Sequence, residues 1–179
     1  MEEQIMNMPA VALRGLTILP GMIAHFDISR ERSLRAVEEA MEQDQKIYLV
    51  TQRNVDSEDP TQEDLYQMGI VADIKQVVRL QNDVVRILVD GISRAALLGF
   101  TGNEKYLEAE ICYCDSNADS LPEDLREAML LGVREAFHRY AAVVGKISKE
   151  LIRQIDQYEE LEKLIDYVTN NLPVSYELK

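Results

Sequence analysis

The sequence predicts an α+β fold in which an antiparallel β-rich half precedes a helical bundle. Up to residue 115 the apolar runs are short, β-branched and separated by turn residues, as in strands. From Ser120 onward apolar residues recur every three or four positions, which is the period of a helix. We therefore expect a β-rich part over residues 1–115 and a helical part over residues 116–179, with a linker at 115–119.

The β-rich part contains a hairpin signal that indicates the direction of its strands. Two apolar runs, 76–80 and 84–91, flank Gln81, Asn82 and Asp83, a cluster that favours the turn between antiparallel strands. Further strands are predicted at 11–13, 23–28, 47–50 and 106–111. We expect these strands to form a small antiparallel sheet or barrel.

One helix is predicted among the strands, over residues 30–43. Leu34, Val37 and Met41 recur at helical spacing, and Ser29 stands directly before them in the position of an N-cap. Such a helix would cover the sheet or close one end of a barrel, and it would protect strand edges that are otherwise exposed.

The helical part carries start and stop signals. Ser120 and Glu123 fit a capping box, in which each side chain bonds a free amide of the first turn. Gly145 is expected to end this helix and Ser148 to begin the next, while a further helical segment ends before Pro173. The predicted apolar stripe of the first helix consists of residues at four-residue spacing, widened by five further residues. The first set is Leu125, Met129, Val133 and Phe137, and the second is Leu121, Leu130, Ala136, Tyr140 and Val144.

Composition and charge argue against several classes of function. The formal net charge of -13 over 179 residues repels phosphate backbones, so we expect no nucleic-acid binding. No apolar run approaches the roughly 20 residues of a membrane span. The acidic start at Glu2 and Glu3 is the reverse of a signal peptide. We expect a cytoplasmic protein without membrane contact.

The two cysteines are predicted to be reduced packing residues. Cys112 and Cys114 lie two apart in a predicted strand, so their side chains share one face, and a disulfide at that spacing is rarely accommodated. A metal site needs more ligands, and His25 and His138 lie far away in the sequence with no motif around them. We therefore expect no metal and no cofactor in this chain.

Sequence motifs for covalent chemistry are missing as well. The nearest approach to a phosphate-binding loop is Gly145 with Lys146, but Ile147 stands where a hydroxyl is required. No GxSxG motif is present, and the clustered carboxylates fall in segments that read as solvent-facing helix surfaces or loops. We predict no catalytic residue.

A candidate binding surface is the bend around Pro20 and Gly21. Leu19, Pro20, Met22 and Phe26 would place apolar side chains on or beside an exposed turn, and methionine adapts to variable partners. The competing interpretation is that these residues close the end of the barrel. We take these four residues as the predicted substrate-contact site.

An ordered set of sequence blocks resembles one family, the N-terminal domain of the ATP-dependent Lon protease. The blocks include LRGLTILPGM at 13–22, KIYLVTQ at 46–52, DLYQMG at 64–69, RILVDG at 86–91 and NLP at 171–173. No single block is diagnostic, but their order over nearly the whole chain is specific.

The resemblance implies a PUA-like pseudo-barrel followed by a helical bundle, ahead of an AAA+ ATPase module and a protease with a serine-lysine dyad. It implies a non-catalytic domain for substrate recognition and oligomer assembly in an enzyme that degrades misfolded and short-lived regulatory proteins. ATP and Mg would bind outside these residues. The implied partners are unfolded or degron-bearing proteins and further copies of the chain, as a hexamer at full length and a dimer for this fragment. The alternative is a free-standing PUA-like module that binds RNA or a small ligand.

Overall fold

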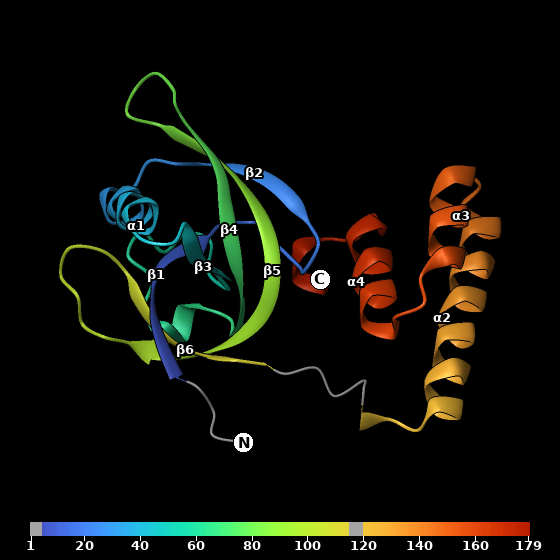
Figure 1. The fold of residues 1–179 in the computed structure, drawn as a ribbon. Helices are drawn as coiled ribbons and strands as arrows, with labels where there is room; N and C mark the ends of the chain where they lie inside the picture. Colours follow the sequence, from blue (N-terminus) through green and yellow to red (C-terminus); the bar gives the residue numbers. More distant parts are fainter. Residues whose placement is uncertain (1–4, 115–119) are drawn as a thin grey trace. The chain divides into compact units, whose positions relative to one another are not determined.

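The computed structural model describes residues 5–114 and 120–179 (Figure 1). The described residues form two compact units, one with residues 5–114 and 175–179 and one with residues 120–174. The predicted linker at 115–119 lies outside the described residues. The last five residues, expected in the helical part, group instead with the β-rich unit, where the Thr17 hydroxyl donates a hydrogen bond to the Tyr176 carbonyl at 3.0 Å.

The β-rich unit is built on a six-stranded sheet that closes partly on itself. Its strands are β1 (Ile5–Leu13), β2 (Ile23–Ile28), β3 (Lys46–Thr51), β4 (Met68–Arg79), β5 (Val85–Phe100) and β6 (Glu108–Tyr113). They lie in the order β2-β5-β4-β3-β1-β6, and the second half of β5 also pairs with β6. The long, curved β5 therefore belongs to both ends of the sheet (Figure 1).

The prediction of a wholly antiparallel sheet is wrong at one pair of strands. β1 and β3 run parallel, with Ala10 opposite Tyr48. The chain between them holds β2 and the helix α1 (Glu31–Glu42), which together provide the crossover that parallel neighbours require. All other strand pairs between these elements are antiparallel.

Two hydrophobic cores lie on opposite faces of β1, β3 and β4. On β1, Val11 and Leu13 belong to the first, which we call core 1, whereas Ala10 and Ala12 belong to the second, core 2. β2, α1 and the first half of β5 cover core 1, and β6 with the second half of β5 covers core 2. Strands that are buried on both faces explain the continuous apolar runs in the sequence.

The predicted hairpin turn between β4 and β5 is confirmed. Leu80 donates its amide to the Val84 carbonyl at 2.8 Å. Asn82 and Asp83 adopt φ values of 60° and 56°, in the left-handed region that asparagine and aspartate tolerate better than most residues.

The predicted helix is present as α1, but its N-cap and its buried face differ from the prediction. The N-cap is Arg30, not Ser29, and no side chain caps the first turn. The buried residues are Ser33, Ala36, Val37 and Ala40. Of the three residues at helical spacing, Val37 is buried, Leu34 is partly buried against core 1 and Met41 is 39% exposed. The small side chains let the helix lie close to the sheet, so its buried face is centred on them.

Tyr48 is the largest fully buried side chain, and its hydroxyl donates to the Ala95 carbonyl at 3.0 Å. Burial raises the pKa of the Tyr48 phenol above its ordinary value of 10.0. The folded state therefore holds the neutral phenol, and the contribution of Tyr48 to stability is complete below pH 10.0.

The Tyr48 phenol predicts a loss of stability in alkali. Above pH 10.0, where the unfolded phenol ionises, the free energy of unfolding should fall with rising pH. Tyr48→Phe should cost about 1 kcal/mol at neutral pH, because one hydrogen bond is lost, and should show a shallower decline in alkali. Urea unfolding between pH 8 and 11 measures both effects. Parallel pH profiles for the two proteins would contradict this role of the phenol.

The second unit consists of three helices, α2 (Glu123–Val144), α3 (Lys149–Gln157) and α4 (Leu161–Asn171). They pack around a separate core of Leu130, Phe137, Ala141, Ile155, Leu161 and Leu164. No helix in the described part of the chain is both long and apolar enough to cross a membrane.

The helix boundaries in this unit follow the sequence signals in part. Gly145 ends α2 with φ 66° in the left-handed conformation, and Ser148 begins α3 by accepting the Leu151 amide at 3.1 Å, both as predicted. The predicted capping box at Ser120 is wrong, because Pro122 is the N-cap of α2 and no side chain caps the helix.

The predicted buried stripe of α2 is also partly wrong. Leu130 and Phe137 of the predicted stripe are buried, but Leu125 and Met129 are 46% and 41% exposed, and Ala141, outside the stripe, is buried. α2 has apolar residues on two adjoining faces, and the core formed with α3 and α4 takes up one of them.

Candidate functional site

The four predicted contact residues lie in the connection between β1 and β2 and in β2 itself. Leu19 is only 7% exposed, and Met22 and Phe26 are partly buried against core 1, while Pro20 is half-buried. The segment thus helps to close the barrel, which was the competing interpretation. These residues remain a predicted contact site, with Leu19 contributing little surface.

An exposed apolar surface lies directly beside this segment. Ile23 is 68% exposed and Ile92 is 47% exposed. Ile23 lies opposite Asp90, and Ile92 follows Asp90 by two positions on β5, so the two isoleucines are diagonal neighbours on the outer face. Leu88, half-buried and opposite His25, lies on the same face. We call Ile23, Leu88 and Ile92 the outer apolar patch.

A bulge in β5 accounts for the exposure of Ile92. β4 pairs Ala72 with Gly91 and Val71 with Ser93, which leaves Ile92 between them without an opposite residue. Such a bulge bends the strand and redirects the extra side chain.

Gly91 joins this bulge to the loop that carries the predicted contact residues. The Gly91 carbonyl accepts the Gly21 amide at 2.8 Å, and the Gly91 amide donates to the Met22 carbonyl at 3.0 Å. The same backbone position thus orders the loop and the outer apolar patch.

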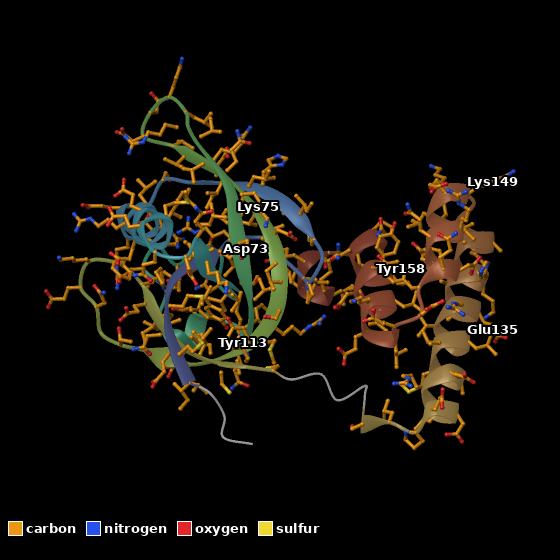
Figure 2. All side chains as sticks on the ribbon, in the orientation of Figure 1. Asp73, Lys75, Tyr113, Glu135, Lys149 and Tyr158 are labelled. Atoms are coloured by element: carbon orange, nitrogen blue, oxygen red, sulfur yellow. The ribbon has the colours of Figure 1, made fainter. Side chains whose placement is uncertain are left out.

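Ion pairs surround the outer apolar patch. Arg86 donates two hydrogen bonds to the Asp27 carboxylate, at 2.7 and 2.8 Å, and this bonding lowers the pKa of the Asp27 carboxyl. Lys75 pairs with Asp73 at 3.1 Å and approaches Asp90 at 3.8 Å (Figure 2). Apolar side chains with a charged rim are typical of an interaction surface.

A small cavity of about 350 Å³ opens at the barrel end near Thr17 and Tyr176. The Arg53 guanidinium lies 5.0 Å from the centre of the Tyr66 ring, a cation–π contact at the edge of this cavity. The cavity combines polar and aromatic groups, among them Thr17, Thr51 and Tyr66.

The residues weighed for metal or redox chemistry are not brought together. Cys112 is buried and Cys114 is exposed, and the two do not form a disulfide. His25 is exposed on the outer face of β2, and His138 pairs with Asp156 on the helical unit at 2.8 Å. Within residues 5–114 and 120–179, no group of three or more potential ligands is arranged to hold a metal ion.

The outer apolar patch was missed at the sequence level, although a signal for it exists. In β2 the residues of one face are Ile23, His25 and Asp27, and the two polar members indicate that this face meets solvent. Because side chains alternate along a strand, Ile23 shares this face with the two polar residues and is exposed with them. The exposure of Ile92 has no comparable signal, because it depends on the bulge.

The fold and this surface define a binding domain, in which the β-rich unit presents an apolar patch with a charged rim. Comparison with known proteins identifies the domain further. The model of the family described as ATP-dependent protease La (LON) substrate-binding domain matches residues 7–179, and the chain belongs to this family.

Curated relatives are consistent with this membership. Lon protease from Lachnoclostridium phytofermentans is 36% identical over 179 residues, which is 100% of this chain and 22% of that protein. Lon protease 1 from Bacillus subtilis is 31% identical over 173 residues, covering 97% of this chain and 22% of that protein. The chain therefore spans about a fifth of the length of the curated relatives it matches.

Solved structures show the same fold. The N-terminal domain of the Mycobacterium avium complex Lon protease matches with a TM-score of 0.75 at 15% identity, covering 97% of this chain and 87% of that chain. A Lon N-terminal domain protein from Xanthomonas campestris matches with a TM-score of 0.53 at 14% identity, covering 94% and 99%. The predicted α+β fold is confirmed.

Proposed function

We propose that this domain captures unfolded or degron-bearing polypeptides for an ATP-dependent serine protease that degrades misfolded and short-lived regulatory proteins. The observation that carries the proposal is the outer apolar patch, where Ile23 and Ile92 are 68% and 47% exposed beside the predicted contact residues. Unfolded chains expose apolar side chains that folded proteins bury, so a small apolar surface distinguishes the two.

The size and charge of the surface favour weak, transient capture. Two isoleucines and a half-buried leucine bury far less area than the roughly 1,200 Å² of a stable interface. The net charge of -13 keeps the domain soluble and opposes binding of RNA. A cytoplasmic location, and ATP and Mg bound outside these residues, complete the proposal.

Binding of an unfolded protein tests the patch directly. Ile23→Asp combined with Ile92→Asp should weaken binding of a labelled, reduced and S-alkylated protein about tenfold, because two apolar contacts are replaced by charge. Fluorescence anisotropy measures the dissociation constant. Leu98→Asp is the matched control, since Leu98 is 42% exposed on the other half of β5.

If Leu98→Asp weakens binding of the unfolded protein as much as the double variant does, or if the double variant binds normally, the outer apolar patch is not the contact surface. If the double variant binds normally, Met22→Asp tests the originally predicted segment. Unchanged binding there as well would leave neither surface as the contact.

Oligomer assembly is the second part of the proposal, and the outer face of α2 supports it. Leu125, Met129 and Val143 are 46%, 41% and 87% exposed, and with Gly132 and Ala136 they follow the three- and four-residue spacing of a helix-pairing stripe. A second copy of α2 would cover this stripe, giving a weak dimer of the fragment and contributing to a hexamer at full length. Sedimentation velocity at rising concentration tests the dimer, and a strictly monomeric fragment at millimolar concentration contradicts it.

A further inference from the structure

A small cavity of about 280 Å³ lies where the ends of β1 and β2 meet the start of α1. Arg14, Asp27, Arg30 and Ser33 are among its lining residues. None of the three residues of the outer apolar patch lines this cavity, whereas Phe26 and Asp27 of β2 border both the cavity and the contact surface described above.

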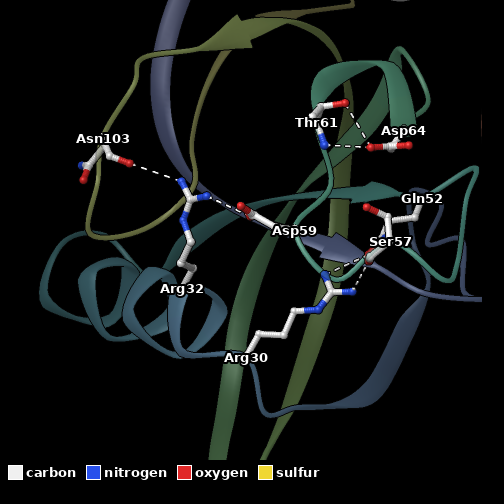
Figure 3. Close-up of polar contacts among 8 residues, drawn as sticks. All are labelled: Arg30, Arg32, Gln52, Ser57, Asp59, Thr61, Asp64 and Asn103. Carbon is white, nitrogen blue, oxygen red and sulfur yellow. Dashed lines mark hydrogen bonds and ion pairs between the residues drawn. The ribbon is translucent and has the colours of Figure 1, made fainter.

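Two guanidinium groups at this cavity share a neutral acceptor. The Ser57 carbonyl accepts a hydrogen bond from Nη2 of Arg14 at 2.8 Å. It also accepts one from Nη2 of Arg30 at 3.1 Å, while Nη1 of Arg30 donates to Oε1 of Gln52 at 2.9 Å (Figure 3). Among the described residues, no carboxylate lies within ion-pair distance of either arginine. Burial and the neighbouring Arg14 charge lower the pKa of Arg30. Two neighbouring guanidinium groups that form no ion pair with a carboxylate favour an anion.

Among the described residues, the acids around this pair form no ion pair with either arginine. The Asp27 carboxylate is held by two hydrogen bonds from Arg86. Asp59 pairs with Arg32 at 3.0 Å (Figure 3). The charges of Asp59 and Glu58 oppose the lowering of the Arg30 pKa, but burial outweighs them.

Ser33 adds an unused donor to the same cavity. It is only 4% exposed and lines the cavity, and its hydroxyl has no hydrogen-bond partner within the part of the chain that the structure describes. Ser33 lies in the first turn of α1, where no side chain caps the free amides. A hydroxyl, two guanidiniums and the positive end of a helix therefore converge on one small space.

The open edge of β2 forms the approach to this cavity. Because Gly91 donates to the Met22 carbonyl, alternate residues of β2 point their backbone groups toward β5, and those of Ile23, His25 and Asp27 point the other way. Within the described residues, these outward backbone groups have no hydrogen-bond partner and β2 pairs with no second strand. Such an edge accepts an extended chain by β-augmentation.

We infer that this cavity binds the C-terminal carboxylate of an extended polypeptide laid along the free edge of β2. The carboxylate accepts hydrogen bonds from Arg14, Arg30 and Ser33, in the geometry that guanidinium and carboxylate groups share. The polypeptide source rests on the proposed function, whereas the carboxylate chemistry rests on the cavity alone.

The shape of the site selects a chain end over an acidic side chain. β2 ends at Ile28 and α1 begins at Glu31, so an added strand cannot continue past this point. The loop that carries Ser57 is held against the same place by Arg14 and Arg30. With its terminus at the arginines, the bound chain runs parallel to β2.

Three peptides of the same length test the inference on the intact chain. The first is an acetylated hexapeptide of alanine, valine and leucine with a free carboxylate, the second is its C-terminal amide, and the third is that amide with one internal glutamate. Dissociation constants come from amide chemical shifts. The free acid should bind at least about tenfold more tightly than either amide, because charge-assisted hydrogen bonds are lost in the amides.

Variants locate the effect. Arg14→Gln should abolish the preference for the free acid, and Ser33→Ala should reduce it about fivefold through the loss of one hydrogen bond. Arg35→Gln, which removes an equal charge from the exposed side of α1, should preserve it. The largest shifts should fall in residues 23–34.

Equal binding of the free acid and its amide, or a preference that survives Arg14→Gln, would overturn the inference. Equal binding of the peptide with internal glutamate would overturn the selection of a chain end. If no peptide binds while the unfolded protein still does, the carboxylate site is wrong and the proposed function stands. If the unfolded protein also fails to bind, both are wrong.

Discussion

Gly91→Ala should lower the free energy of unfolding of the β-rich unit by about 3 kcal/mol or more. A Cβ atom at this position would overlap the Leu19 carbonyl oxygen and lie 3.0 Å from Cδ1 of Ile70. The Leu19 carbonyl accepts the Met22 amide at 3.1 Å, and the Gly21 amide donates to Gly91 itself. The clash can therefore be relieved only by moving the loop, and such overpacking is costly. The same change should disturb the loop that carries Leu19, Pro20 and Met22.

Gly132→Ala provides the control for this substitution. A Cβ atom there meets no atom within 4 Å, and Gly132 lies inside α2, so alanine should raise stability by about 0.5 to 1 kcal/mol. Urea unfolding followed by amide peaks of each unit measures both changes. If Gly91→Ala is as stable as the parent protein, the Leu19 carbonyl does not pack closely against Gly91 in solution.

Leu164→Ala should destabilise the helical unit by about 2 to 5 kcal/mol and leave the β-rich unit folded. Leu164 is fully buried in the core shared by α2, α3 and α4, so alanine leaves a cavity. The described residues divide into two compact units, and the loss should remain in one of them.

Hydrogen exchange distinguishes the two units after this substitution. Amides of α2, α3 and α4 should exchange faster, while those of β3 and β4 keep their protection. Leu125→Ala, at a position 46% exposed on α2, should change stability by less than about 0.5 kcal/mol. Loss of protection in β3 together with the helices would contradict independent units.

Local signals in the sequence predicted most of the elements. β2 was predicted with its observed limits, and the turn at Asn82 and Asp83 and the helix end at Gly145 follow from residue types that favour those conformations. In each of these cases neighbouring residues alone determine the outcome.

The predictions that were wrong concern features that depend on contacts between distant parts of the chain. The parallel pairing of β1 with β3 depends on the crossover through β2 and α1, which no local pattern reveals. The buried face of α2 depends on where α3 and α4 pack, so Leu125 could not be separated from Phe137 by periodicity.

The predicted contact residues adjoin the outer apolar patch but do not coincide with it. The segment from Leu19 to Phe26 borders the outer apolar patch, but the most exposed apolar residues are Ile23 and Ile92. The exposure of Ile92 follows from a bulge, and the cavity at Arg14 and Arg30 follows from the meeting of three elements. Both features depend on contacts between separate elements, so no pattern within one segment of the sequence predicts them.

The most direct test of polypeptide capture is an amide-shift map of the domain titrated with a reduced and S-alkylated protein that cannot refold. Shifts should concentrate in β2 and the first half of β5, around Ile23, Leu88 and Ile92, and should saturate at high micromolar to millimolar concentration, in the range of weak binding. Shifts confined to the helical unit, or none up to millimolar concentration, would contradict capture by the β-rich unit.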